Sequence, residues 1–181
     1  SGPFATIGGA DRDNIASFDT ATGNLTSSGL KATDMVNAFA FNQDASIIYA
    51  GGYFGSIGEG VVRRYNLVKL FADGSLDTGF APVVVGGGDG TLSIAISPDG
   101  STLYIGGSIQ SVAGQARGNL AALDANTGAL KPFAPTVDSI SRSLVVSPDG
   151  KTLYLGGFFT TVNGQTRNRI AAINTETGEL I

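Results

Sequence analysis

The chain has 181 residues, of which 42% are hydrophobic and 14% are charged, and its net charge is −4. It contains no cysteine, no histidine and no tryptophan. This composition excludes disulfides, thiolate or imidazole metal sites and a Ser-His-Asp triad, and the acidic balance argues against a nucleic-acid partner. No apolar run reaches the roughly 18 residues of a membrane-spanning helix, so we expect no membrane span.

The chain opens with one half of a repeated unit. Residues 4–12 predict a loop that closes on an arginine, and this loop recurs at 108–117 and 158–167. A strand is expected after each loop, followed by a turn and a short fourth strand that begins at Leu130 in the third copy. The four expected strands are residues 14–19, 64–66, 119–124 and 169–174.

The other half of the unit predicts a β-hairpin. Residues 92–96 alternate large and small apolar side chains, which indicates a strand. Ser-Pro-Asp-Gly at 97–100 predicts a turn, because proline fixes φ and aspartate can bond its own backbone. Residues 102–105 predict the return strand, which ends at a Gly-Gly pair. The hairpin recurs at 147–157 and, with fewer matching residues, at 42–52.

The spacing of the repeats predicts an all-β fold. The Gly-Gly pairs begin at 51, 106 and 156, at spacings of 55 and 50 residues. Four short antiparallel strands in a unit of about 50 residues are typical of a β-propeller blade. We therefore predict a β-propeller built of four-stranded antiparallel blades, with a single propeller-like domain over 1–181 and repeat units at 4–53, 54–108, 109–158 and, in part, 159–181.

The number of blades leaves the ring incomplete. The loop half occurs four times and the hairpin half three times, which gives about three and a half blades. A closed propeller has about four to eight blades. We therefore expect further blades as partners, from the same or a second chain. The chain belongs to a larger ring, which we favour, or pairs to make seven blades, or associates head to tail into a filament.

Two motifs carry a resemblance to known repeats. The Ser-Pro-Asp-Gly-x-Thr-Leu-Tyr-x-Gly-Gly pattern resembles the blade signature of YVTN and related bacterial propeller repeats. The pattern at 156–171 resembles the Delta-60 type repeats of bacterial extracellular and surface proteins. The resemblance implies a propeller fold and an extracellular or cell-surface setting, with the periplasm as an alternative. It implies no particular ligand, because a fold does not define a function.

Residues that recur in every copy are expected to serve the fold. Recurring arginines could bind a carboxylate or sulfate, but their recurrence favours an ion pair or a carbonyl clamp between blades. Recurring aspartates are expected to bond their own turns. The structural set is Arg12, Arg117 and Arg167, with Arg63 or Arg64 near the same place, and Asp99, Asp149, Gly106, Gly107, Gly156 and Gly157.

Positions that break the repeat are the candidates for binding. Arg142 stands where the other copies have Leu92 and Asn37. Tyr53 and Phe158 stand where the third copy has serine. Exposed aromatic side chains beside polar groups suit a glycan or protein ligand, whereas packing between blades is the alternative. The predicted rim consists of Tyr53, Phe54, Glu59, Arg63, Arg142 and Phe158.

No cofactor or metal is expected. Residues 11–14 offer oxygens to Ca²⁺ but lack the alternating ligands and distal glutamate of a calcium loop. The glycines at 86–90 resemble a phosphate loop, but no helix and no lysine follow, so we interpret them as a flexible connection between blades.

The sequence therefore predicts a non-catalytic module for binding, adhesion or assembly. Its alternatives are a subunit of a secreted filament and a polysaccharide lyase or hydrolase with its site on the loop rim. Hydrolysis by paired carboxylates would need two facing acids, one with a raised pKa. The acids outside the strongest repeat turns are Asp34, Asp44, Glu59, Asp89 and Asp138.

Overall fold

The computed structural model describes residues 1–26, 30–57 and 63–181. These ranges form strands, turns and bends, and they contain no helix. Accordingly, the described chain holds no helix with the length and apolar character needed to cross a membrane. The all-β class is therefore confirmed.

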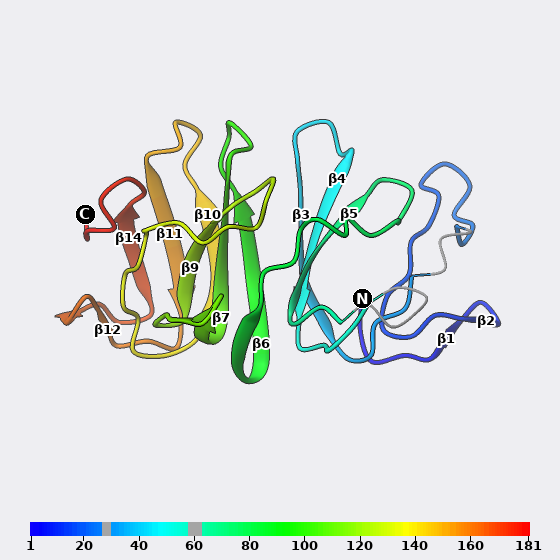
Figure 1. Cartoon of the computed structure of the whole chain (residues 1–181), viewed down its shortest axis with the longest axis horizontal. Helices are drawn as coiled ribbons and strands as arrows, with labels where there is room; N and C mark the ends of the chain where they lie inside the picture. Colours follow the sequence, from blue (N-terminus) through cyan, green and yellow to red (C-terminus); the bar gives the residue numbers. More distant parts are fainter. Residues whose placement is uncertain (27–29, 58–62) are drawn as a thin grey trace.

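Three larger antiparallel sheets stand side by side in the described chain (Figure 1). Blade 2 holds β3 (Val36–Phe41), β4 (Ile47–Gly52) and β5 (Leu67–Phe71). Blade 3 holds β6 (Val84–Ile96), β7 (Thr102–Val112), β8 (Gln115–Ala116) and β9 (Leu120–Asp124). Blade 4 holds β10 (Ser141–Val146), β11 (Thr152–Gly157) and β14 (Ile170–Asn174).

Small hairpins accompany these sheets. Blade 1 holds the hairpin of β1 (Thr6–Ile7) and β2 (Ala10–Asp11), and blade 4 carries the hairpin of β12 (Thr161–Val162) and β13 (Gln165–Thr166). The sequence predicted plain loops here. The difference arises because two successive residues adopt positive φ, as at Asn163 (50°) and Gly164 (74°), and such turns match the twist of a hairpin.

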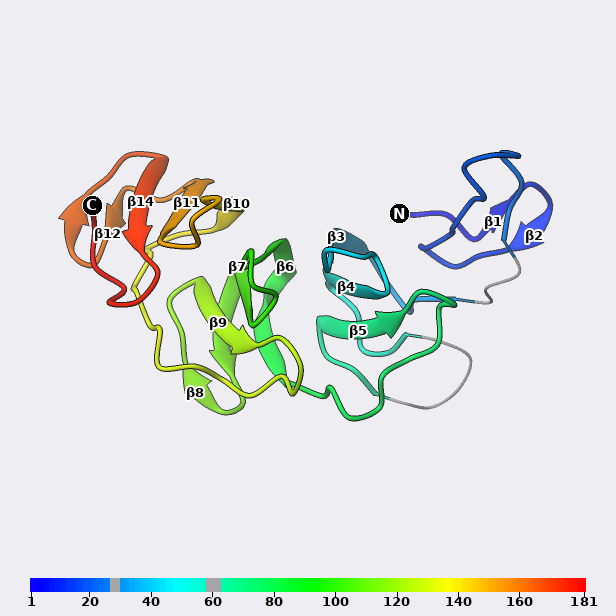
Figure 2. The same ribbon diagram turned by 90° about the horizontal axis from the view of Figure 1, so that it is seen from above.

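The blades form an open arc when seen from above (Figure 2). The first strands β3, β6 and β10 lie on the concave side, and β5, β9 and β14 lie on the convex side. Blade 1 and blade 4 stand at the two ends of the arc, as expected for part of a propeller. The repeat units defined by sequence start at the loop, so each combines the third strand of one blade with the first two strands of the next.

In each of the three larger sheets, the central strand pairs with one strand on either side. In blade 3, β7 pairs with β6 on one side and β9 on the other, and Ile105 faces both Ile94 and Ala121. The fourth strand is reduced to an isolated bridge, such as Leu123 to Leu130. Pro132 follows closely and has no N–H to donate, so the ladder ends there.

Several strand predictions differ from the structure. Residues 14–19 form no strand and contribute only the isolated bridge of Phe18 to Leu25. The return strand β7 does not end at the Gly-Gly pair but continues to Val112. The third strand of blade 2 begins at Leu67, after the residues 64–66 that were predicted to form it.

The glycines at 86–90 lie inside β6 rather than in a connection between blades. The ladder shifts there from the Gly86–Ile109 pair to the Thr91–Gly107 pair, so the residues between them bulge out of the sheet. Residues 86–90 lack the alternation of apolar and polar side chains that marks a strand, so the sequence did not predict this part of β6.

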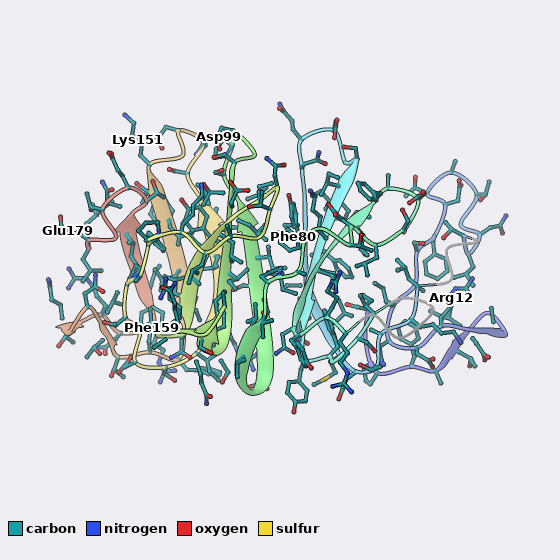
Figure 3. All side chains as sticks on the ribbon, in the orientation of Figure 1. Arg12, Phe80, Asp99, Lys151, Phe159 and Glu179 are labelled. Carbon is teal, nitrogen blue, oxygen red and sulfur yellow. The ribbon has the colours of Figure 1, made fainter. Side chains whose placement is uncertain are left out.

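Each pair of neighbouring blades encloses its own hydrophobic cluster. Phe80 belongs to the cluster between blades 2 and 3, and Phe159 to the one between blades 3 and 4 (Figure 3). Full burial of such a side chain contributes about 1.5–3 kcal/mol. A tyrosine of the central strand meets a phenylalanine edge to face in both clusters, with ring centroids 5.8 Å apart for Tyr49–Phe80 and 5.4 Å apart for Tyr104–Phe133.

The Gly-Gly pairs, which end β4 and β11 and lie inside β7, allow close approach of the backbone. A Cβ on Gly107 would lie 2.1 Å from the carbonyl oxygen of Gly90, and one on Gly157 would lie 2.1 Å from that of Ile140. A Cβ on Gly106 would lie 2.8 Å from the Ser93 hydroxyl of its own blade and 3.0 Å from Ser141 of the next blade, whereas the nearest atom to one on Gly156 is 3.7 Å away. At the second position of each pair, a Cβ would collide with the backbone of the same blade, so glycine is required there.

Candidate functional site

The recurring arginines clamp backbone carbonyls. Nη2 of Arg12 donates to the carbonyl of Thr26 at 3.0 Å, and the same bond joins Arg64 to Thr78 at 3.0 Å. Arg117 reaches the carbonyl of Lys131 at 3.4 Å, and Arg167 bonds the preceding residue at 2.9 Å. Arg64 therefore holds the repeat position, and its neighbour Arg63 is free for another role. Arg12, Arg64 and Arg117 therefore hold the fourth segment of their own blades, which is a carbonyl clamp within a blade and not between blades.

Asparagines that the sequence analysis missed connect successive blades. The side-chain amides of Asn14, Asn66 and Asn119 donate to carbonyls 18 residues further on, at 2.9, 2.9 and 2.8 Å. All three have positive φ, which asparagine tolerates better than most residues. Their position two residues after the clamping arginine was the available signal. Blade 4 departs from the pattern, since Arg169 stands at this position with a φ of 69°.

The turn aspartates accept several hydrogen bonds each. Asp99 accepts from the Ser97 hydroxyl and from the N–H and hydroxyl of Ser101. These bonds favour the carboxylate and lower the pKa of Asp99 to about 2. Hydrogen bonds, first among them the one from the Thr160 hydroxyl, likewise lower the pKa of Asp138 to about 2. Hydrogen bonds lower the pKa of five further aspartates: Asp19, Asp44, Asp73, Asp124 and Asp149.

These lowered pKa values predict a loss of stability in acid. The carboxylates of Asp99 and Asp138 stabilise the folded state above their ordinary pKa of 3.8, and this contribution is lost as the pH falls toward about 2. We expect the thermal midpoint, followed by circular dichroism, to fall between about pH 4 and pH 2. The double variant D99N/D138N should start lower at neutral pH and lose less over this window. An equal loss in both proteins would contradict the assignment.

The lower rim of blade 2 gathers exposed aromatic side chains. We call upper rim the hairpin ends that carry Asp99 and Lys151 (Figure 3), and lower rim the opposite edge of the blades. Tyr53 and Tyr65, both exposed, border a depression of about 270 Å³ together with Thr33 and Asp34. Arg63 borders an adjoining depression of about 270 Å³ and donates to the Tyr65 hydroxyl, which raises the pKa of Arg63. We name Tyr53, Tyr65 and Arg63 the tyrosine rim.

The other predicted rim residues differ in their placement. Phe54 is buried in the cluster between blades 1 and 2, and it also lines the depression beside Tyr53 and Tyr65. Glu59 lies outside the described residues. Arg142 and Phe158 belong to blade 4, so the structure does not bring them together with Tyr53. Tyr65 was missed because it stands where the other copies have Gly118 and Asn168.

A basic corner lies on blade 4. The guanidinium of Arg142 stands over the exposed ring of Phe158, 4.9 Å from its centroid, and that of Arg169 lies 6.0 Å from it. Each such contact contributes about 0.5–1 kcal/mol at an exposed site. The ion pairs found within the described ranges join other residues, Lys31 to Asp13 and Lys69 to Asp77. We call Arg142 and Arg169 with Phe158 the basic corner. Within the described ranges, neither arginine of this corner forms an ion pair with a carboxylate.

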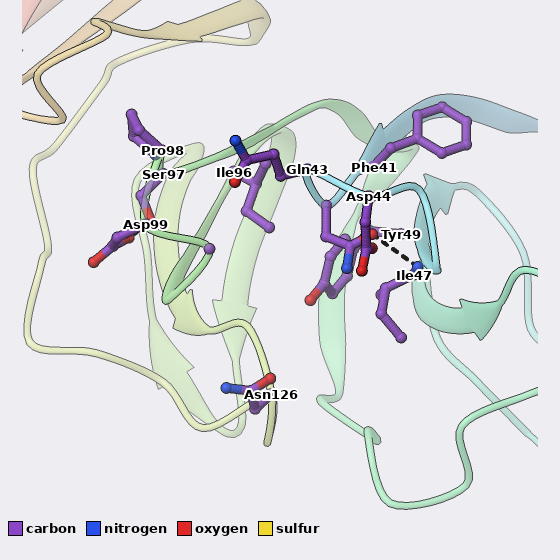
Figure 4. Close-up of a pocket in the computed structure, with 12 residues that line it drawn as sticks. Phe41, Gln43, Asp44, Ile47, Tyr49, Ile96, Ser97, Pro98, Asp99 and Asn126 are labelled. Carbon is purple, nitrogen blue, oxygen red and sulfur yellow. Dashed lines mark hydrogen bonds between the residues drawn. The ribbon is translucent and has the colours of Figure 1, made fainter.

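A groove on the upper rim separates blades 2 and 3 (Figure 4). It measures about 620 Å³, and the turn at 97–100 faces the hairpin at 42–47 across it, while the Phe41 ring points away. Asp44 and Asp99 both line it, both have lowered pKa values, and none of the lining residues is a cation. The groove is therefore negative at neutral pH and disfavours anionic ligands.

Metal ligands do not gather in this structure. Within residues 1–26, 30–57 and 63–181, no group of three His, Cys, Asp or Glu side chains is placed to hold a metal ion.

The repeated sheets, arranged in an arc around their first strands, define a β-propeller. Residues 48–80 and 147–179 match a family model described as a domain of unknown function (DUF5122) β-propeller. The matched stretches supply the second and third strands of blades 2 and 4. This match supports a β-propeller repeat family.

A solved structure is similar in fold. The hydrazine synthase of Kuenenia stuttgartiensis matches with a TM-score of 0.63 and 19% sequence identity. The match covers 92% of this chain and 41% of that chain, so the present chain spans less than half of its length. At this identity the likeness shows the propeller fold alone. No curated protein matches the chain.

Proposed function

We propose that this chain is a non-catalytic β-propeller module that binds a glycan through the tyrosine rim of blade 2. The tyrosine rim is the observation that carries the proposal. Tyr53 and Tyr65 are exposed beside one depression, and Arg63 lies at its edge. Aromatic rings offer flat apolar surface to the faces of sugars, and a guanidinium offers several donors to hydroxyl or carboxylate groups.

The carboxylates support a binding role over a catalytic one. Glycoside hydrolysis needs an acid whose pKa is raised so that it can donate a proton. Asp44 and Asp138, two of the candidate acids, have lowered pKa values because they accept hydrogen bonds. They therefore remain ionised at neutral pH and are poor proton donors.

The setting that we propose is extracellular or the cell surface. It rests on the resemblance of the 156–171 pattern to repeats of bacterial surface proteins. A rigid arc of sheets that carries its variable side chains on the rims suits adhesion, because loops and strand ends can vary while the packed blades hold them in place.

Binding to a panel of neutral and uronate-containing polysaccharides tests the proposal. We expect the double variant Y53A/Y65A to bind about tenfold more weakly in isothermal titration calorimetry, since each stacked ring contributes about 0.5–1.5 kcal/mol. The matched control is F71A, which removes an exposed ring at the end of β5. Equal affinity for both variants would overturn the site. Turnover of a polysaccharide that is lost in E59A or R142A would overturn the non-catalytic role.

A structural subunit of a secreted filament is the second candidate function. The observation that favours it is the group of exposed apolar side chains on blade 4, namely Val145, Tyr154 and Ile170. Light scattering that shows open-ended growth with concentration would favour this function over glycan binding.

A further inference from the structure

The tyrosine rim holds two adjoining depressions. The first depression is lined by Tyr53, Tyr65 and Asp34, and the second is lined by Tyr65 and Arg63. Both are also lined by Thr33, so the two depressions share lining residues and adjoin each other. Each measures about 270 Å³, near the lower limit of roughly 300 Å³ for ligand pockets. Each therefore suits one sugar unit, and the pair suits two successive units.

The two depressions carry opposite charges. Asp34 lies in the first, where its Oδ1 accepts from the N–H of Met35 at 2.8 Å. Arg63 lies in the second, where its guanidinium donates to the Tyr65 hydroxyl. Neither side chain forms an ion pair within residues 1–26, 30–57 and 63–181. A ligand that spans both depressions thus meets a carboxylate at one unit and a guanidinium at the next.

The second depression is particular to blade 2. Arg63 and Tyr65 stand directly before and after the clamping arginine, and neither side chain recurs beside the clamping arginines of the other copies. Their counterparts are acidic, small or polar, namely Asp11, Ala116 and Thr166 for Arg63, and Asp13, Gly118 and Asn168 for Tyr65. Because residues that serve the fold recur, these two are free to serve a ligand.

The backbone beneath the two depressions is held in place before any ligand binds. The N–H groups of Gly55 and Ser56 both donate to the Thr33 hydroxyl at 3.1 Å. Arg64 donates its N–H to the carbonyl of Gly55 at 2.9 Å, and its guanidinium clamps the carbonyl of Thr78 at 3.0 Å. A site that is ordered in advance pays little conformational entropy on binding.

We propose that the tyrosine rim binds a glycan in which a uronate follows a neutral sugar, with the uronate carboxylate at Arg63 and the neutral sugar in the depression of Asp34. This inference rests on glycan binding by the tyrosine rim and adds the class of glycan. The planar guanidinium matches a carboxylate, whereas Asp34 repels a second one. The Tyr65 hydroxyl accepts from Arg63, so its own proton remains for an oxygen of the ligand between the two units.

The charge requirement is tested with ligands that differ only in charge. The probes are oligosaccharides of hyaluronan, unsulfated chondroitin and heparosan, which alternate glucuronate with a neutral N-acetylhexosamine, and the methyl esters of their carboxyl groups. In isothermal titration calorimetry we expect the esters to bind about fivefold more weakly than the acids, as an exposed ion pair of good geometry contributes. R63Q should lose this preference by weakening the acid alone. R142Q, which changes an exposed arginine of blade 4, is the matched control and should keep it.

The role of Asp34 is tested with a glycan that carries a carboxylate on every unit. Oligogalacturonate should bind the original chain weakly, because one of its carboxylates would lie beside Asp34. D34N keeps an oxygen acceptor for the N–H of Met35 and removes the negative charge. We expect D34N to bind oligogalacturonate about threefold more tightly and the alternating oligosaccharides with nearly unchanged affinity.

The outcomes separate this inference from glycan binding itself. Equal affinity for acids and esters, an R63Q variant that keeps the preference, or binding of neutral polysaccharides alone overturns the uronate and leaves glycan binding standing. Unchanged binding of oligogalacturonate by D34N overturns the neutral unit beside Asp34. If Y53A/Y65A binds acids and esters as tightly as the original chain, or if no glycan binds at all, glycan binding by the tyrosine rim fails and this inference fails with it.

Discussion

Replacing Gly157 by alanine should destabilise the chain by about 3 kcal/mol or more, at the upper end of overpacking effects. The added Cβ would lie 2.1 Å from the carbonyl oxygen of Ile140 and 3.1 Å from the ring of Phe159. Neither can yield easily, because the Ile140 carbonyl accepts from the Phe158 N–H at 2.9 Å and the ring is fully buried. Urea unfolding followed by circular dichroism measures the free energy of unfolding directly.

The neighbouring glycine is the matched control. A Cβ on Gly156 would meet its nearest atom at 3.7 Å, which is ordinary contact, so G156A should change the free energy of unfolding by less than about 1 kcal/mol. Equal effects of G157A and G156A would contradict the close approach of the two backbones at the lower rim. Both substitutions add the same methyl group at adjacent positions, so they differ mainly in the space around the added Cβ.

Replacing Phe159 by alanine should cost about 3–5 kcal/mol, the usual range for a large aromatic side chain removed from a core. Phe159 is fully buried in the cluster between blades 3 and 4, where it packs with residues of both. The truncation leaves a cavity in a small interface, because each pair of blades has only its own cluster to hold it together.

The preceding residue again gives the control. Phe158 is exposed, and its ring contacts only the guanidinium groups of Arg142 and Arg169 among the ring interactions of the described residues. F158A should therefore cost less than about 1 kcal/mol, the value of an exposed cation–π contact. If F158A were as damaging as F159A in urea unfolding, the assignment of inner and outer faces in blade 4 would be wrong.

The sequence predicted the fold through features that act locally. Ser-Pro-Asp-Gly specifies its turn by itself, so the hairpins at 97–100 and 147–150 could be placed without tertiary information. The period of the Gly-Gly pairs then implied repeated blades. The Gly86–Gly90 bulge could not be seen, because its strand is held by pairing with β7 and not by its own side-chain pattern.

The candidate site was harder to predict, because adjacent aromatic residues take opposite roles. Phe54 and Phe159 share a position that is apolar in each of these copies, including Ile109, and this recurrence was a signal of burial. Tyr53 and Phe158 share a position that varies, and both are exposed. Tyr65 had no equivalent to mark it, since only the folded chain brings it beside Tyr53 and Arg63.

The central claim is that the tyrosine rim of blade 2 binds a glycan. Isothermal titration calorimetry of the original chain and of Y53A/Y65A against the panel of polysaccharides tests this claim most directly. We predict that the original chain binds a polysaccharide and that the double variant binds it about tenfold more weakly, whereas F71A leaves the affinity unchanged. Equal affinity of the original chain and the double variant would contradict it.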